Sequence, residues 1–487
     1  MRDNINMKNK LRYIILLGVG LLISTFSCMA QGEQLRNALK PKYVFLFIGD
    51  GMGKSHVELT HSYIKSAKGK IRKGKLSFTG FHAYAECTTE SKDSKVTDSG
   101  AAGSAIACGK KANNGSIAFY PEYPTAAMPA SIAKKAHSIG YKVGIITNVS
   151  IDHATPAVFY AVNESRENYY DIGYQLPLSG FEFFGGGGFK YPKGKENDQE
   201  DLYDRVKEFG YVVTNDILEI SQIDTSVNGL MFVNPVLLEK GEMPYGIDRE
   251  EHGGNELKDI VREAIGFLFN DKGFFIMVEG GKIDWASHNN DAATIAQEVM
   301  DFNNAILEAF SFYSFHPNET LIIVTADHET GGIYFIEPNI DSINNKGYLN
   351  MQISSVDYFS DVLLEYKNSN TAYSLKDVIS LANLHFYSQP LVFSEKENKD
   401  IDEAYNLFFY NNTTLSNDEI EVKYGGLNPV AVVFSNILSN RAGVAFSTWD
   451  HTDTMVPVYT LGLHSVYFNE DMDNTNFMSK LNEIMKW

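Results

Sequence analysis

The chain has 487 residues, 44% of them hydrophobic, so it can bury a large core in one enlarged domain or in two. Asp and Glu outnumber Lys and Arg by 61 to 42, for a formal net charge of -19. This acidity argues against a surface that binds nucleic acid or an anionic membrane, and any phosphate site must therefore be locally positive.

The amino terminus has the pattern of a secretory signal: basic residues, an apolar run over 13–26, and a small residue at Ala30. The apolar run is shorter than the roughly 20 residues that a membrane-spanning helix needs, and no later stretch qualifies. We therefore predict a signal peptide over 1–30, export to the periplasm or extracellular space, and no membrane span after cleavage. An uncleaved anchor and a lipid-modified Cys28 are the alternatives, but the residues before Cys28 make a poor lipoprotein motif.

Short, continuously apolar runs rich in β-branched or aromatic residues predict buried parallel strands. These runs are Tyr43 to Ile48, Val143 to Thr147, Phe274 to Val278 and Leu321 to Thr325. Between them, apolar residues recur at helical spacing over 129–139 and 292–310. The alternation predicts an α/β fold with a large, mostly parallel central sheet and helices on both faces.

The pattern changes from about residue 337 to 442, where helix-like pieces alternate with polar, Asn-rich joints. We interpret this segment as an insertion or cap within a single domain over 31–487. It contributes no obvious metal ligand.

Two cysteines, Cys87 and Cys108, remain after signal cleavage, and they flank Ser99 in sequence. A single disulfide is possible in an oxidising compartment, but free cysteine commonly fills a core, which favours two buried thiols.

Polar side chains follow each predicted strand. Asp50 follows the first, the segment 148–155 the second, Glu279 the third, and Asp327 with His328 the fourth. In open α/β sheets, ligands gather beyond the carboxyl ends of the strands. We therefore expect these groups to converge at one edge of the sheet.

Asp98 and Ser99 precede a run of small residues that suits a closely packed helix. A helix amino terminus there would direct free N–H groups at an alkoxide or a bound phosphate. The alternative is plain capping, since Asp and Ser are common N-caps.

Asp284 and His288 are four residues apart, which puts both on one helical face. A lone pair of this kind is more often a structural hydrogen bond than a metal site. Asp327 and His328 repeat the same ligand types after another strand, which favours zinc-type N/O sites.

The chain resembles the alkaline phosphatases of the alkaline phosphatase superfamily, bacterial exported type, from about Lys42 to Tyr459. The motifs that carry the resemblance are the run from Gly49 to Gly53, the Thr97-Asp98-Ser99 block with Cys108-Gly109 and Asn114-Gly115 after its helix, and the spacing of Glu279, Asp284 and His288.

The resemblance implies hydrolysis of phosphate monoesters through a phosphoserine on Ser99, with Arg166 holding two phosphate oxygens. It also implies a homodimer, two Zn2+ ions and one Mg2+ ion. The implied ligands are Asp284, His288 and His451 for one zinc; Asp50, Asp327 and His328 for the other; and Asp50, Thr155 and Glu279 for magnesium.

Two positions vary within the family. His153 stands where some members have an aspartate near the magnesium site, which leaves open whether this third site prefers magnesium or zinc. Trp285 stands where some members carry a lysine, which makes it a candidate for the substrate pocket.

Three other functions are alternatives to that of a monoesterase. A sulfatase is disfavoured because the C/S-x-P-x-R motif is absent around Ser99, and a phosphodiesterase because Arg166 suits the extra oxygen of a monoester dianion. A metal- or phosphate-binding protein without activity needs no nucleophile beside its ligands.

Overall fold

The computed structural model describes residues 39–66, 75–124, 127–336, 346–369 and 371–486. The predicted signal peptide and Cys28 lie outside the described residues. None of the helices in the described ranges is long and apolar enough to cross a membrane.

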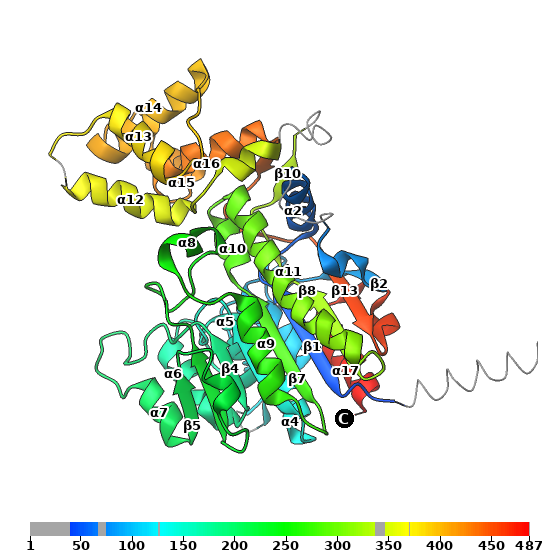
Figure 1. The fold of residues 1–487 in the computed structure, drawn as a ribbon. Helices are drawn as coiled ribbons and strands as arrows, with labels where there is room; N and C mark the ends of the chain where they lie inside the picture. The colour runs from blue at the N-terminus through cyan, green and yellow to red at the C-terminus, as the bar shows by residue number, and fades with distance from the viewer. Residues whose placement is uncertain (1–38, 67–74, 125–126, 337–345, 370, 487) are drawn as a thin grey trace, which may run out of the picture.

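A ten-stranded sheet forms the centre of the described structure (Figure 1). Its strands in chain order are β1 (Tyr43–Gly49), β2 (Ala83–Thr88), β3 (Lys142–Thr147), β4 (Phe183–Gly186), β5 (Tyr211–Thr214), β6 (Gly229–Val233), β7 (Phe274–Gly280), β8 (Thr320–Thr325), β13 (Val456–Gly462) and β14 (Met472–Asp473). Their spatial order is β14-β2-β13-β8-β1-β7-β3-β4-β6-β5. All neighbours pair in parallel except β13, which is antiparallel to both β8 and β2.

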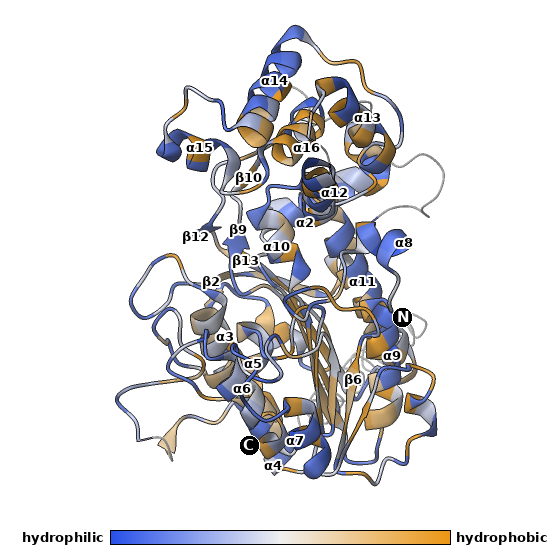
Figure 2. Ribbon diagram, turned by 90° about the vertical axis from the view of Figure 1, so that its left-hand side faces the viewer, coloured by the Kyte–Doolittle hydropathy of each residue, from blue (hydrophilic) through white to orange (hydrophobic). Residues whose placement is uncertain are grey.

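Helices cover both faces of the sheet. Figure 2 shows α3 and α5 on one side of the strands and α9 and α11 on the other. The helices outside the predicted insertion are α2 (Lys54–Ser66), α3 (Ser99–Cys108), α4 (Ile132–Ser138), α5 (Ala154–Tyr160), α6 (Tyr169–Gln175), α7 (Leu202–Glu208), α8 (Arg249–His252), α9 (Leu257–Leu268), α10 (Lys282–His288), α11 (Ala292–Phe315) and α17 (Asn476–Met485). The predicted α/β class, with its mostly parallel and doubly covered sheet, is confirmed.

The four predicted strands are the central ones, β1, β3, β7 and β8. Because they are buried on both faces, their side chains read as continuous apolar runs rather than as alternating ones. The predicted helix over 129–139 begins only at Ile132, because Ser131 caps it by accepting a hydrogen bond from the Lys134 N–H.

Residues 346–369 and 371–441 form a helical region above the sheet, visible at the top of Figures 1 and 2. Its helices are α12 (Val356–Ser369), α13 (Leu375–His385), α14 (Glu395–Tyr410), α15 (Asn417–Tyr424) and α16 (Pro429–Arg441). They enclose a second hydrophobic core, which also takes in Leu59 of α2 and, at the start of α11, Ala292, Ala293, Ile295 and Ala296. This region therefore packs directly onto the part of the fold that carries α10.

Both remaining cysteines are free, and burial raises the pKa of Cys87 to about 12 and that of Cys108 to about 11. The prediction of two buried thiols is confirmed.

An ion pair joins two helices of the helical region and gives it a pH-dependent stability. Arg441 at the end of α16 donates from Nε and Nη2 to both carboxylate oxygens of Glu397, which also completes the capping box of α14 with Ser394. The Arg441 hydrogen bond, opposed by partial burial, lowers the pKa of Glu397 to about 2. We expect Glu397→Gln to destabilise the region by about 1–2 kcal/mol at neutral pH.

Because the Glu397 pKa is lower in the folded chain, the ionised carboxylate contributes its full stability only above its unfolded value of 4.5, and loses it as the pH falls to about 2. The difference in unfolding temperature between the wild type and Glu397→Gln should shrink below about pH 4.5. Glu395→Gln in the same helical turn is the control. A difference that stays constant with pH would rule out the ion pair as its cause.

Candidate active site

The carboxyl ends of three adjacent strands bring three acidic side chains together. β1 lies between β7 and β8, with Ile48 in register with both Glu279 and Thr325. Asp50 follows β1, Glu279 lies near the end of β7 and Asp327 follows β8, and none of the three is exposed. The predicted convergence at one edge of the sheet is confirmed for these groups.

Ser99 is the first residue of α3, and Asp98 is its N-cap. The Asp98 carboxylate accepts the Ala101 N–H at 2.9 Å, so the capping role belongs to Asp98. Ser99 is 2% exposed, and its Oγ lies 3.3 Å from Nε2 of His328. The serine hydroxyl is therefore directed at the cluster of acids and imidazoles.

Arg166 reaches the same place from the loop after α5. Its Nη1 donates to Asp98 at 2.8 Å, and its Nη2 lies 3.2 Å from Nε2 of His153. Asp98 thus both caps the helix of Ser99 and orients the guanidinium beside it.

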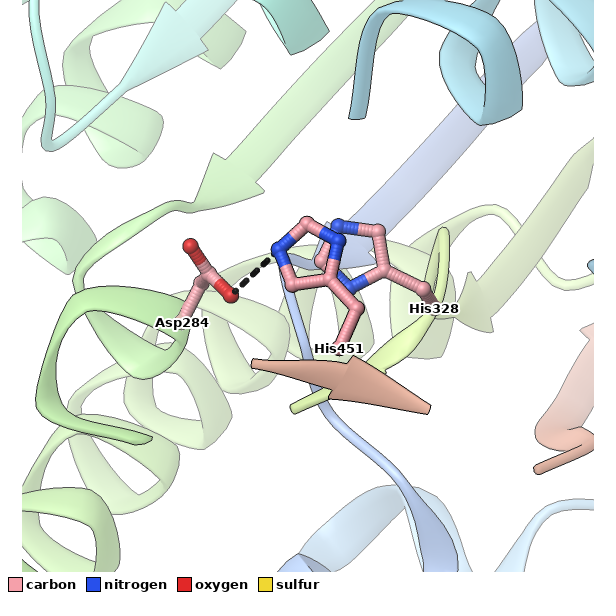
Figure 3. Close-up of side chains that lie close together, drawn as sticks. All are labelled: Asp284, His328 and His451. Atoms are coloured by element: carbon pink, nitrogen blue, oxygen red, sulfur yellow. Dashed lines mark ion pairs between the residues drawn. The ribbon is translucent and has the colours of Figure 1, made fainter. Parts of the chain in front are cut away.

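One group of possible metal ligands contains Asp284, His328 and His451 (Figure 3). The rings of His328 and His451 stack at 3.6 Å, and Nε2 of His451 lies 3.6 Å from Asp284. His288 adjoins this group, with its Nε2 3.1 Å from Nε2 of His451 and 3.5 Å from Asp284. The predicted helical spacing therefore does bring Asp284 and His288 together on α10.

His451 comes from far along the chain because of a short antiparallel pair. β12 (His451–Thr452) pairs with β9 (Glu329–Thr330), directly after His328. The Nδ1 atom of His451 lies 2.8 Å from the Thr97 carbonyl, and that of His288 2.5 Å from the Trp449 carbonyl. A carbonyl can only accept, so Nδ1 of each ring donates to it, and Nε2 is the ring nitrogen that faces the site and could bind a cation.

Two further groups share Asp50. The first consists of Asp50, Asp327 and His328, with Nε2 of His328 3.4 Å from Asp50 and 3.3 Å from Asp327. The second consists of Asp50, His153 and Glu279, and Thr155 adds a hydroxyl that donates to Asp50 at 3.1 Å. His153, which the sequence suggests as a candidate for the third site, thus lies with Asp50 and Glu279 among the possible ligands of that site.

Four buried polar atoms in these groups have no hydrogen-bond partner. They are Asp50 Oδ1, His153 Nδ1, Glu279 Oε1 and Asp327 Oδ2. Leaving such atoms unpaired is costly, so their number in one place indicates that this cluster is suited to binding cations. The donor set of imidazoles and carboxylates fits zinc, and the oxygen-rich group around Asp50, Thr155 and Glu279 fits a harder ion.

Burial and the neighbouring charges shift the pKa values of these carboxyl groups. Burial, followed by repulsion from Asp284, raises the pKa of Asp327 to about 8, and burial with neighbouring acids raises that of Asp50 well above its usual value. Burial opposes the ionisation of Asp284 as well, but His288 and His451 outweigh it and hold its pKa below the usual range. Divalent cations would remove the repulsion and keep all three carboxylates ionised.

A pocket of about 490 Å³ opens over the cluster, lined by Ser99, Arg166, Trp285 and other residues of the site. Trp285, predicted from the sequence as a pocket residue, lies there with Nζ of Lys240 4.9 Å from its ring and Nζ of Lys282 4.8 Å from it. Lys240 also lines this pocket, but it belongs to no motif and was not predicted from the sequence. Asp357 and Leu427, which reach the pocket from the helical region, were not predicted either.

A hydroxyl at the start of a helix, next to three sets of cation ligands, is suited to displacement at a phosphoryl or similarly charged centre. Fold and site together define an α/β enzyme whose candidate site is suited to metal-assisted hydrolysis.

Comparison with known proteins gives the family. The model of the family described as alkaline phosphatase matches residues 41–487, and the chain belongs to this family of phosphate monoester hydrolases. The chain is 27% identical to alkaline phosphatase 4 of Bacillus subtilis over 99% of its own length and 98% of the relative's. It is 29% identical to alkaline phosphatase 3 of the same organism, over 94% and 92% of the two chains.

Solved structures agree on the fold. Alkaline phosphatase from Thermus thermophilus superposes with a TM-score of 0.76 at 24% identity, covering 92% of each chain. Alkaline phosphatase from the Antarctic bacterium TAB5 superposes with a TM-score of 0.62 at 26% identity, covering 92% of this chain and 98% of the other.

Proposed function

We propose that the protein hydrolyses phosphate monoesters to an alcohol and inorganic phosphate through a phosphoserine formed on Ser99, with two zinc ions and one magnesium ion bound. The observation that carries the proposal is the buried Ser99 hydroxyl, whose Oγ lies 3.3 Å from Nε2 of His328, a member of two of the three groups of possible cation ligands. Family membership supports the reaction class.

Three sets of residues would hold the ions. Asp284, His288 and His451 would hold the first zinc. Asp50, Asp327 and His328 would hold the second, and Asp50, Thr155 and Glu279 would hold the magnesium. When bound, the ions lower the pKa of the nucleophile and neutralise charge on the transferring and leaving oxygens.

The chain's own groups perform the rest of the reaction. Ser99 Oγ attacks phosphorus in line with the departing alcohol and is phosphorylated. N–H groups at the start of α3 point at the incoming anion. Arg166 is oriented by Asp98 through a 2.8 Å hydrogen bond. Its planar guanidinium donates hydrogen bonds to two phosphoryl oxygens. Water then hydrolyses the phosphoserine and restores Ser99.

His153 bears on the identity of the third ion. One solved structure is a variant of the TAB5 enzyme in which an aspartate replaces a histidine, with Mg bound in its M3 site. We propose that His153 adds an imidazole to the third site here, which weakens its preference for magnesium over zinc.

The proposed function is tested by assaying the purified mature protein at alkaline pH against three matched aryl esters. We expect rapid hydrolysis of p-nitrophenyl phosphate and at least about hundredfold slower hydrolysis of bis-p-nitrophenyl phosphate and p-nitrophenyl sulfate. Faster turnover of the diester or the sulfate would reassign the reaction. Tight phosphate binding without turnover of any ester would indicate a binding protein.

Thr330 is expected to hold two of the metal sites in position. It is fully buried, and its Oγ1 donates to Asp284 at 2.5 Å and lies 3.2 Å from Nδ1 of His328. Thr330→Val keeps the shape but removes the hydroxyl, and should weaken zinc binding by about 10–100-fold, measured by competition with a chromophoric chelator. Thr330→Ser is the matched control and should retain near-normal affinity. Equal affinities of the two variants would show that the hydroxyl has no such role.

Export and assembly are further proposals. We infer that residues 1–30 are a cleaved signal that directs the protein to the periplasm or extracellular space. We also infer that the mature chain, residues 31–487, forms a homodimer. Within this single domain, residues 337–442 are an insertion. Mass spectrometry of the mature amino terminus tests the first inference, because a diacylglyceryl cysteine at Cys28 would contradict it. Sedimentation equilibrium tests the second.

A further inference from the structure

A β-turn over residues 238–241 brings a lysine, Lys240, into the active-site pocket, and the proposed reaction does not use it. The Gly241 N–H donates to the Leu238 carbonyl at 3.0 Å, which closes the turn. Gly241 has a φ of 78°, in the left-handed region that favours glycine. Lys240 precedes it, and its side chain lines the pocket together with Ser99 and Arg166.

The turn is fixed to the carboxyl edge of the sheet by backbone hydrogen bonds. The Gly241 carbonyl accepts the N–H of Gly188, which lies just after β4, at 2.8 Å. The Met243 N–H donates at 2.9 Å to the carbonyl of Asn148, directly after β3. The backbone of Lys240 is therefore held against the same strand ends that carry the site.

The ammonium group of Lys240 lies against Trp285, with Nζ 4.9 Å from the centre of the ring. Within the described ranges, no carboxylate lies within 4.0 Å of this Nζ. Lys282 also places its Nζ 4.8 Å from the Trp285 ring, but it is 1% exposed and is not among the residues that line the pocket. Lys240 is exposed, so its charge is available to a ligand.

The pocket has little other positive charge of its own. Among the described residues that line it, Arg166 and Lys240 are the arginine and the lysine. Arg166 is already paired with Asp98 at 2.8 Å. Asp357, a pocket residue of opposite charge, accepts a hydrogen bond from Asn289 at 2.9 Å. In a chain with a net charge of -19, an anion in this pocket needs a nearby cation, and Lys240 supplies one.

Side-chain contacts connect Lys240 to the guanidinium group of Arg166. The Trp285 ring meets the His153 ring edge-on, with their centres 6.1 Å apart. Nε2 of His153 in turn lies 3.2 Å from Nη2 of Arg166. The Trp285 ring therefore restrains a long, flexible lysine side chain in the neighbourhood of the arginine that is proposed to hold phosphate.

We propose that Lys240 is a second phosphate-binding residue, whose ammonium group stabilises the phosphoryl group at Ser99 and retains the phosphate product. The inference rests on the proposed function and adds a substrate-binding residue to it. The ammonium group attracts the anion in the substrate complex, in the transition state and in the product complex. Its loss should therefore weaken binding without lowering kcat.

The test replaces the charge and keeps the length of the side chain. We expect Lys240→Met to raise both KM for p-nitrophenyl phosphate and the inhibition constant of inorganic phosphate by about tenfold, with no fall in kcat. Lys240→Arg keeps the charge and should hold both constants within about threefold of the wild type. Lys193→Met removes an exposed lysine from the loop after β4 and should leave both within about twofold.

Ionic strength separates the charge of Lys240 from its packing. The difference between the wild type and Lys240→Met should narrow as salt rises from about 0.05 M to about 1 M, because an exposed charge is screened. A structural effect of the substitution would not follow the salt concentration.

Unchanged KM and phosphate inhibition in Lys240→Met, or equal losses in Lys240→Arg, would overturn the inference. A fall in kcat with both constants unchanged would also overturn it. If the wild type hydrolyses no phosphate monoester, the proposed function fails instead. Calorimetric titration of the metal-loaded protein with inorganic phosphate then decides the role of Lys240: weaker binding by Lys240→Met supports it, and equal affinity or no binding contradicts it.

Discussion

Ser99→Ala is expected to lower kcat/KM for phosphate monoesters by at least about a thousandfold, with metal content unchanged. The hydroxyl is the group that is phosphorylated, and the substitution removes it without disturbing the helix. Asp98 rather than Ser99 caps α3, and alanine is a good helix former. The unfolding temperature should therefore change little, while steady-state assays of the fully metallated variant show the loss.

Ser104→Ala on the same helix is the matched control. Ser104 Oγ donates to the Gly100 carbonyl at 2.6 Å and accepts the Ala118 N–H at 2.7 Å, so its role is structural. Its loss should cost about 1–2 kcal/mol of stability and leave kcat nearly unchanged. If Ser99→Ala retained activity within about tenfold of the wild type, Ser99 would not be the nucleophile.

Removal of the metal ions has the second large expected effect. Chelation should abolish activity and lower the unfolding temperature, because Asp50, Glu279 and Asp327 are fully buried and close to one another. Each ion contributes about 2.7 kcal/mol to stability when its free concentration is a hundred times its dissociation constant. Calorimetric scans and activity assays before and after chelation measure both effects.

Restoration by different ions tests the assignment of the sites. Zinc followed by magnesium should restore both activity and unfolding temperature, and magnesium alone should restore neither fully, because imidazole donors suit zinc. An apoprotein with unchanged activity and unchanged unfolding temperature would contradict a metal site at this position.

The sequence predicted those parts of the fold and site that follow from local pattern. The central strands are buried on both faces, so their continuous apolar runs are recognisable in the sequence. An acidic residue directly after a parallel strand must lie at the carboxyl edge of the sheet, where ligands gather. Asp50, Glu279 and Asp327 were found in this way. The single-turn spacing of Asp284 and His288 was similarly visible.

Other parts depend on contacts between distant segments. His451 reaches the site through the two-residue pairing of β12 with β9, which is too short to leave a sequence pattern. The resemblance, not the spacing, suggested it. Lys240 and Asp357 enter the pocket from irregular or surface positions that carry no periodicity. Thr330 is close to Asp327 and His328 in the sequence. Its contact with Asp284, however, arises only because α10 packs against β9 in the folded chain.

Phosphorylation of Ser99 during turnover is tested directly by acid-quenching the enzyme while it hydrolyses a phosphate monoester and locating the modification by peptide mass spectrometry. We expect one phosphoryl group on the peptide that contains Ser99, absent from Ser99→Ala and from the chelated protein. A wild type that turns over at full rate with no phosphorylated peptide, or with phosphate on a different residue, would contradict it.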